Sequence, residues 1–297
     1  MNVEKFEKIL RTKKIKYDFY TIKNINNKKK IAFFYLKKKI IFLLKISLNI
    51  FTSNQFKNEI NSYNFIKKKR IHFLTTSAEK FYNNKSISIL KIKYVDGEKG
   101  SFFDLKKFYQ RKYIKTKTIN LSNYKNILKN NFKKIHLVNI KIDNDFKKIN
   151  NYFKKEKLKI CLSHGDFAHW NTISNRKKNY VFDLEYFSKE RIYLYDILHW
   201  LIQPYINKIR FFNYTTKFNI FLIFLIKYNL NNLNVKYNKR EIIKYIIVYF
   251  IEIKYTYYIA KYISKKYKII SPKDLKRSKI LYKFCSQQIS YFLRLVD

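Results

Sequence analysis

Short apolar runs alternate with clusters of Lys and Asn from Tyr17 to Tyr94. The stretch KKKIAFFYLKKKIIFLLKISL predicts two strands joined by a basic turn at Lys37–Lys39. In the second of these strands, Leu44 and Ile46 fall on one face and Lys45 on the other, because successive side chains of a strand point to opposite faces. The first part of the chain is therefore predicted to begin with a pair of neighbouring strands.

A helix is predicted to follow, from about Ser53 to Lys67, with Ser53 or Asn54 as its cap. Its apolar stripe consists of Phe56, Ile60, Tyr63 and either Phe65 or Ile66. The run SISILKIKYV, which ends at Asp96, predicts a further strand. Strands followed by a helix and another strand indicate a small α+β lobe.

The rest of the chain is predicted to be mostly helical, since RIYLYDILHWLI and EIIKYIIVYFIEIKYTYYIAKYI place apolar residues at helical spacing. Gly97 and Gly100 lie in VDGEKGS, which favours a hinge or an ordinary turn between lobes of residues 1–95 and 96–297. The longest nearly continuous apolar tract, Phe218–Ile226, is far shorter than the roughly 20 residues that span a bilayer. We expect a buried helix there and no transmembrane segment.

The formal net charge of +45 would ordinarily indicate a nucleic acid or an anionic membrane as partner. Here Lys is spread along the whole chain, together with an excess of Ile, Asn, Phe and Tyr and only three Gly and two Pro. The favoured residues have A/T-rich codons, so a nucleotide-composition bias explains the charge without a ligand. The charge should still attract polyanions at low salt, and that attraction should fade as salt rises.

Two cysteines, Cys161 and Cys285, cannot form a disulfide framework and are predicted to be reduced core residues. The first residues, MNVEKFEKILRTKK, carry charges where a signal peptide needs an apolar stretch. These two observations favour a cytoplasmic location.

The residues that carry chemistry lie between 159 and 187. A short strand, Ile160–Leu162, leads into HGDFAHWN, in which Asn171 follows Asp166 by five residues. Asp183 comes twelve residues later, after the apolar run YVF that predicts another strand. Polar loops at the ends of paired strands bring oxygen-bearing side chains together. Phosphoryl transfer needs such a set, because Mg²⁺ takes hard oxygen ligands while a carboxylate orients the attacking hydroxyl.

HGDFAHWN followed by VFDLE resembles the signature of the aminoglycoside phosphotransferase and choline kinase-like family, which is related to the protein kinases. The resemblance implies a bilobal protein kinase-like fold of class α+β, with a small antiparallel-sheet lobe containing one helix and a larger, mostly α-helical lobe. It implies Asp166 as the catalytic base, His164 as an organiser of the loop, and Asn171 and Asp183 as metal ligands. Glu185 would join Asp183 as a ligand if the backbone stays extended between them.

The resemblance also predicts a nucleotide-binding lysine on a strand and an acid on the next helix that pairs with it. Lys45 in IIFLLKIS and Glu59 in FKNEINSYNFI match these two roles. The sequence departs from the kinase pattern in one respect, because no glycine precedes Gly97. The hairpin between Tyr20 and Phe34 would then cover the phosphates through its backbone amides or lysines.

The function predicted from these residues is a phosphotransferase that moves the γ-phosphoryl of ATP or GTP to a hydroxyl of a small molecule, with Mg²⁺ as cofactor. Carboxylates are few after Glu185, so a neutral or anionic hydroxyl compound such as a sugar is favoured over a polycationic acceptor. HGDFAHWN also resembles phosphotransferases encoded with bacterial surface-polysaccharide enzymes, which implies a surface-polysaccharide precursor. The alternatives are an inactive pseudokinase scaffold and a basic nucleic-acid-associated protein. Asp166, Asn171 and Asp183 are all present, which disfavours the first, and no nucleic-acid-binding motif supports the second.

Overall fold

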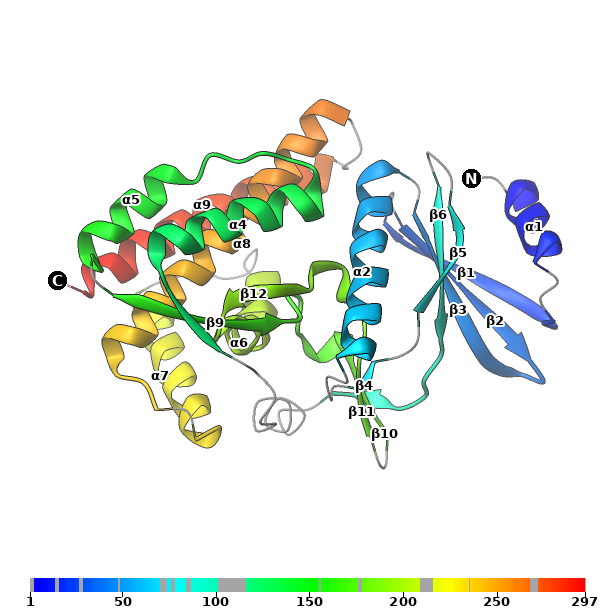
Figure 1. Ribbon diagram of the computed structural model, residues 1–297, viewed down its shortest axis with the longest axis horizontal. Coiled ribbons are helices and arrows are strands. Elements are labelled where there is room, and N and C mark those ends of the chain that lie inside the picture. The colour runs from blue at the N-terminus through cyan, green and yellow to red at the C-terminus, as the bar shows by residue number, and fades with distance from the viewer. Residues whose placement is uncertain are drawn as a thin grey trace.

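The computed structural model of the chain is drawn in Figure 1. It describes residues 3–13, 16–26, 29–47, 49–69, 74–75, 78–83, 87–100, 116–154, 156–175, 178–208, 216–234, 236–267 and 272–296.

The predicted pair of strands lies in a five-stranded antiparallel sheet near the N-terminus. Its members are β1 (Phe19–Asn26), β2 (Lys29–Leu36), β3 (Lys39–Ser47), β5 (Ala78–Asn83) and β6 (Ser88–Lys93). They are arranged in the order β1-β2-β3-β6-β5. Lys37 and Lys38, between β2 and β3, have φ angles of 49° and 62°. Positive φ at both central residues is what the common two-residue hairpin turn requires.

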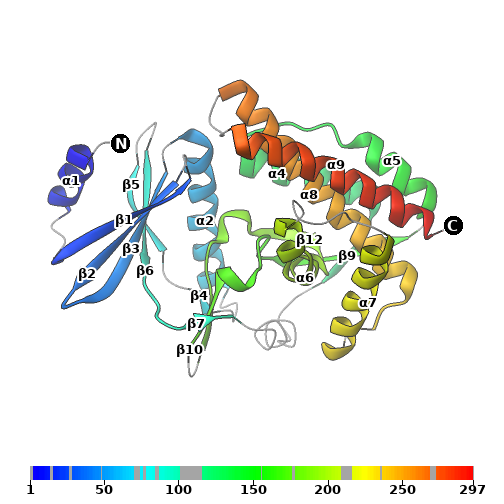
Figure 2. The ribbon, with the colours of Figure 1, turned by 180° about the vertical axis from the view of Figure 1, so that it is seen from behind.

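Two helices, rather than the single one predicted, cover the two faces of this sheet (Figures 1 and 2). Helix α1 (Val3–Thr12) packs Phe6, Ile9 and Leu10 against Phe34, Leu44 and Ile46. Helix α2 (Ile50–Lys68) packs Phe56 against Leu90 and Ile92 on the opposite face. Because both faces are covered, Lys45 is buried as well as its neighbours Leu44 and Ile46.

Helix α2 begins before the predicted cap. Asn49, rather than Ser53 or Asn54, is the N-cap, and its side chain accepts hydrogen bonds from the backbone N–H groups of Phe51 and Thr52. An asparagine oxygen in this position satisfies donors that the helix leaves unpaired. The prediction missed it because Asn49 directly follows the apolar strand.

The remaining described residues are mostly helical, as predicted. The helices are α4 (Leu121–His136), α5 (Asp143–Tyr152), α6 (Tyr195–Lys208), α7 (Thr216–Asn232), α8 (Lys239–Tyr267) and α9 (Pro272–Arg294). Residues 246–251 of α8 are fully buried, as expected for a helix that is apolar on all sides. Cys161 and Cys285 are buried and free, which confirms the prediction of reduced core cysteines. The α+β class with an antiparallel sheet and a helical second part is confirmed.

Two small sheets support the loops of the second part. One has the order β12 (Ser188–Ile192), β9 (Lys157–Ser163) and β8 (Lys117–Asn120). The other has the order β4 (Leu74–Thr75), β11 (Lys178–Val181), β10 (Thr172–Asn175) and β7 (Glu98–Lys99). Strands β9 and β11, which precede the two polar loops, therefore lie in different sheets, so the expectation that they pair with each other was wrong.

Residues 95–100, which contain Gly97 and Gly100, contribute strand β7 to this second sheet. Strand β7 pairs with β10, and the backbone N–H of Gly100 donates to Thr172 O at 3.1 Å. A Cβ atom at Gly97 would lie 2.5 Å from Ser174 O, which is too close for any side chain. The division into lobes of 1–95 and 96–297 stays a prediction.

Helix α7 contains the apolar tract that was predicted to be a buried helix, and only one of its sides is buried. Leu222 and Ile226 have no exposed surface, whereas Ile220 and Phe224 are 60% and 65% exposed. Within the residues that the structure describes, no helix is both long and apolar enough to cross a membrane.

Candidate active site

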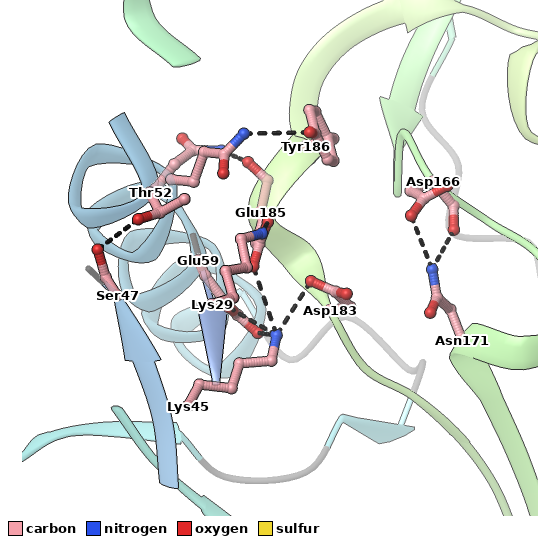
Figure 3. Close-up of polar contacts among 12 residues, drawn as sticks. Lys29, Lys45, Ser47, Thr52, Glu59, Asp166, Asn171, Asp183, Glu185 and Tyr186 are labelled. Atoms are coloured by element: carbon pink, nitrogen blue, oxygen red, sulfur yellow. Dashed lines mark hydrogen bonds and ion pairs between the residues drawn. The ribbon is translucent and has the colours of Figure 1, made fainter. Parts of the chain in front are cut away.

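Lys45 is the centre of a buried cluster of charges between β3, α2 and the loop that follows β11 (Figure 3). Its Nζ atom lies 3.0 Å from both carboxylate oxygens of Glu59 and 3.0 Å from Oδ1 of Asp183. Oε1 of Glu185 is 3.7 Å from the same atom. Lys29 of β2 makes an ion pair with the other oxygen of Glu185. The structure thus brings together four residues that the sequence had assigned to the nucleotide and the metal, and adds Lys29.

Glu185 reaches this cluster by a route that the sequence did not predict. Asp183 has a φ of 66°, in the left-handed region, and residues 184–186 form a single 3₁₀ turn, η2 (Leu184–Tyr186). The extended backbone assumed between Asp183 and Glu185 was therefore wrong. The turn is fixed to α2, because Asn58 Nδ2 donates to the backbone oxygens of Glu185 at 2.7 Å and Phe187 at 3.3 Å.

Burial opposes ionisation throughout this cluster, and the opposite charges decide which groups stay ionised. Burial would lower the pKa of Lys45, but Asp183 and Glu59 raise it well above its usual value. Burial would likewise raise the pKa of Asp183, but Lys45 and Lys29 hold it well below its usual range. Burial raises the pKa of Glu59 to about 7 against the effect of Lys45. It also raises the pKa of Glu185, with Asp183 adding to the effect. Lys45 and Asp183 are the charged pair at the centre.

Asp166 lies in the loop after β9 and is held from two sides. Asn171 Nδ2 donates to Asp166 Oδ2 at 2.9 Å and to its backbone oxygen at 2.7 Å (Figure 3). His199 Nε2, on α6, lies 2.9 Å from the other carboxylate oxygen, Oδ1. The Asp166 side chain keeps 28% of its surface exposed, so its carboxylate is oriented and still accessible.

His164 connects the Asp166 loop to the Asp183 loop. Its Nδ1 atom accepts a hydrogen bond from the backbone N–H of Asp166 at 3.2 Å, so the proton is on Nε2, which donates to Phe182 O at 2.8 Å. Burial lowers the pKa of His164, which keeps the ring neutral as this arrangement requires. The backbone N–H of Phe182 in turn donates to Asn171 O at 3.1 Å.

Asp196, in the first turn of α6, fixes the backbone of the same loop. Its carboxylate accepts hydrogen bonds from Ser163 Oγ and from the backbone N–H groups of His164 and Gly165, at 2.9, 2.9 and 3.0 Å. An aspartate near the start of a helix often caps that helix. The partners of Asp196 instead belong to the loop that carries Asp166.

A cavity of about 180 Å³ adjoins Asp166 on the side of the helical lobe. It is lined by residues that include Asp166, Arg191, Tyr195, His199, Gln203 and Tyr257. Among the described residues, the Oε1 atom of Gln203 is buried and has no hydrogen-bond partner. Asp166 and Gln203 therefore line the same cavity.

The carboxylates beside Lys45 fit a divalent metal ion. Oxygen atoms of Glu59, Asp183 and Glu185 lie within 4.8 Å of one another. Glu185 Oε1 is buried without a hydrogen-bond partner in the part of the chain that the structure describes. Carboxylate and amide oxygens are the ligands that Mg²⁺ prefers, and a cation would satisfy this oxygen.

One residue of the site, His199, was missed from the sequence, because it lies in a helix whose pattern is dominated by apolar residues. Lys29 was included only as one of the hairpin lysines that were expected to contact the phosphates. The signal available for His199 was its spacing from Asp196, since residues three apart share one helix face. The turn proposed to cover the phosphates includes residues 27–28, which lie outside the described residues.

No protein-family model and no curated protein sequence matches the chain. Solved structures do match its fold. The GDP complex of an aminoglycoside 2'-phosphotransferase-IIIa variant aligns with a TM-score of 0.63 at 8% identity, covering 100% of both chains. A thermostable mutant of aminoglycoside phosphotransferase APH(4)-Ia, bound to ADP and hygromycin B, aligns with a TM-score of 0.58 at 8% identity over 99% of this chain and 98% of that one. The chain therefore has the protein kinase-like fold of the aminoglycoside phosphotransferases, as predicted.

A kinase outside the aminoglycoside group also shares the fold. Amicoumacin kinase hAmiN, in complex with AMP-PNP, Ca²⁺ and its antibiotic, aligns with a TM-score of 0.53 at 12% identity over 96% of this chain and 93% of that one. At such identities the comparisons show the fold, and the function has to be argued from the site.

Proposed function

We propose that this protein is a phosphotransferase that moves the γ-phosphoryl group of ATP or GTP to a hydroxyl group of a small molecule. The observation that carries the proposal is the pairing of Lys45 with Glu59 and Asp183, next to a loop in which Asn171 holds the Asp166 carboxylate. Phosphoryl transfer is catalysed by positioning and charge neutralisation, which these residue types supply. The nucleotide-bound solved structures with the same fold support this choice.

Each residue has a distinct role in the proposed reaction. Asp166 orients the acceptor hydroxyl and takes its proton, and Asn171 and His164 hold the loop that presents Asp166. Lys45 contacts the nucleotide phosphates, and Glu59 keeps the lysine in place, as the bidentate contact between them supports. Asp183 and Glu185, with the amide oxygen of Asn171, would hold Mg²⁺. The metal, when bound, supplies positive charge that neutralises the phosphate oxygens.

The acceptor that this site favours is a neutral or anionic hydroxyl compound such as a sugar or a surface-polysaccharide precursor. Apart from Asp166, Glu252 is the only carboxylate among the residues that line the cavity. Glu252 is already engaged, because Arg191 Nε lies 2.6 Å from Oε1 and Tyr124 donates to Oε2 at 3.1 Å. Among the described residues that line the cavity, a polycation would therefore find only the Asp166 carboxylate.

The first test is thermal unfolding of the wild type and of Asp183→Ala, with and without Mg-ATP or Mg-GTP. A ligand at 100 times its Kd that binds only the folded state stabilises it by about 2.7 kcal/mol. We expect the wild-type melting temperature to rise with metal and nucleotide together and the rise to vanish in Asp183→Ala. Asp143→Ala removes an exposed carboxylate on α5 and should keep the full shift.

A nucleotide-consumption screen against hydroxyl-bearing metabolites would then identify the acceptor. A folded wild type that shows no shift with either nucleotide at millimolar concentration would overturn the proposal and favour a pseudokinase scaffold. A nucleotide-dependent rise in melting temperature without turnover of any neutral or anionic acceptor would overturn the proposed substrate class. It would leave the proposed nucleotide site intact.

A further inference from the structure

His199 contacts the Asp166 carboxylate and has no role in the reaction as proposed above. Its Nε2 atom lies 2.9 Å from Asp166 Oδ1, and its side chain is only 5% exposed. The ring stacks on Tyr195, with centroids 5.7 Å apart and planes at 15°, and meets the edge of Tyr249 at 6.1 Å. Aromatic rings on two sides thus hold the imidazole in one orientation. The bias towards A/T-rich codons explains the many lysines, but it does not explain this contact, because the chain has only five histidines.

The neighbours of His199 fix which nitrogen carries the proton. An ionised carboxylate only accepts hydrogen bonds, so the nitrogen that faces Asp166, Nε2, must donate. The other nitrogen, Nδ1, lies 3.3 Å from Tyr249 Oη. In a neutral ring that carries its proton on Nε2, Nδ1 is an acceptor, so the Tyr249 hydroxyl, whose pKa burial raises well above its usual value, donates to it. A directed chain of hydrogen bonds therefore runs from Tyr249 through His199 to Asp166.

The position of His199 on α6 links this chain to the backbone of the catalytic loop. Asp196, which accepts hydrogen bonds from the loop N–H groups, lies three residues earlier and therefore on the same helix face. The N-terminal part of α6 thus contacts the loop at two places. Asp196 binds the loop backbone, and His199 binds the Asp166 carboxylate. Asn171 holds the second carboxylate oxygen, Oδ2.

We propose that His199 is a positioning residue that, with Asn171, clamps the Asp166 carboxylate in the orientation needed to take the proton of the acceptor hydroxyl. Each carboxylate oxygen of Asp166 accepts one hydrogen bond, from His199 or from Asn171, and has a second lone pair that can accept a hydrogen bond from the substrate. Among the described residues that line the cavity with His199, Arg191 on β12 and Glu252 on α8 carry the other charges. These two pair with each other, which leaves the Asp166 carboxylate as the acceptor for Nε2–H. This inference rests on the proposed function, since it assigns His199 a task in that reaction.

The contact is tested first without any substrate, by nitrogen-15 NMR of the histidine side chains in the wild type and in Asp166→Leu. We expect His199 to be the neutral form protonated at Nε2, and we expect its Nε2–H proton to shift upfield in Asp166→Leu, where the acceptor is lost. A ring protonated at Nδ1, or an Nε2–H resonance that Asp166→Leu leaves unchanged, would overturn the inference.

The role is tested by turnover of His199→Leu and His199→Gln with the acceptor from the screen, or with water as acceptor in Mg-ATP hydrolysis. We expect His199→Leu to lower kcat about 100-fold with the nucleotide KM nearly unchanged, since small misplacements of catalytic groups have effects of this size. The Gln side chain can still donate from its Nε2 amide, so His199→Gln should recover about tenfold of that loss. Equal losses in the two variants, or an unchanged kcat in His199→Leu, would contradict a positioning role.

Thermal unfolding with Mg-ATP separates the two hypotheses. A normal nucleotide shift in all variants with an unchanged kcat would overturn the role of His199 and leave the phosphotransferase proposal intact. Absence of the shift in the wild type would overturn the phosphotransferase proposal and with it the catalytic role of His199. The NMR measurement would in that case still decide whether the hydrogen bond exists.

Discussion

Replacing Asp196 with alanine should destabilise the protein substantially, because it removes the acceptor for three donors of the loop that carries Asp166. The carboxylate is almost fully buried, and its partners are Ser163 Oγ and the backbone N–H groups of His164 and Gly165. A buried N–H left without a partner costs about 1–3 kcal/mol, so the two backbone groups together cost roughly 2–6. The variant no longer has to bury a charge, which offsets part of this cost. We expect a loss of about 3–4 kcal/mol in the free energy of unfolding.

Urea unfolding and thermal melting would measure this loss, which corresponds to roughly 6–8 °C in melting temperature for a chain of this size. Asp196→Asn is the matched variant, because it keeps the shape of the side chain but turns an amide donor towards the loop N–H groups. It should also be destabilised, which separates lost hydrogen bonds from lost packing. Asp143→Ala, at an exposed ion pair, should leave the melting temperature unchanged. Losses below about 1 kcal/mol in both Asp196 variants would refute the reasoning.

Two further predictions concern the same lobe. Gly165→Ala should lower the free energy of unfolding by roughly 2 kcal/mol or more, because its Cβ would lie 1.9 Å from Arg191 Nη1 and 2.2 Å from Tyr186 O at a φ of 84°; a native-like urea midpoint would contradict this. Burial would raise the pKa of Glu156, but its hydrogen bonds to Lys244 and Arg240 lower it, so its stabilisation is present above the usual carboxyl pKa and is lost as pH falls through the lowered value. The difference in unfolding free energy between wild type and Glu156→Gln should therefore shrink as pH falls from about 5 to 3, and a pH-independent difference in urea titrations would contradict the assignment.

The residues that the sequence identified best are those whose spacing along the chain is fixed by one local loop. Asp166 and Asn171 lie on the same short segment, so the motif already determines that they meet. Lys45 and Glu59 were found from the family resemblance, which implies a lysine on a strand paired with an acid on the next helix, and the structure pairs them. The hydrophobic pattern contributed the strand and the helix on which the two residues lie.

The features that the sequence did not predict depend on tertiary packing. Glu185 faces Lys45 only because Asp183 adopts a left-handed conformation and a 3₁₀ turn follows, and nothing in the letters VFDLE indicates such a turn. His199 was hidden in an apolar helix because its partner, Asp166, lies 33 residues earlier in the chain. Helix α1 was missed because its apolar residues alternate with charges in a segment that was judged only for a signal peptide.

Burial, rather than sequence, distinguishes Lys45 from the other lysines of this lysine-rich chain. Among the described residues, Lys45, Lys244 and Lys254 are the buried lysines, and each has a carboxylate partner, as the cost of burying a charge requires. Among the described residues, Lys244 forms an ion pair with one carboxylate, that of Glu156, and Lys254 with one, that of Asp145.

Lys45 differs from these two because three carboxylates lie within 4.0 Å of its Nζ atom, those of Glu59, Asp183 and Glu185. One partner is enough to neutralise a structural lysine, so the additional carboxylates are more than the fold needs. Lys29 offsets one of them, and a negative charge still remains in a buried place if all three are ionised. A divalent cation that arrives with a nucleotide would balance that charge together with the phosphates. This excess of buried carboxylate is the electrostatic reason to regard the Lys45 cluster as a binding site instead of a structural ion pair.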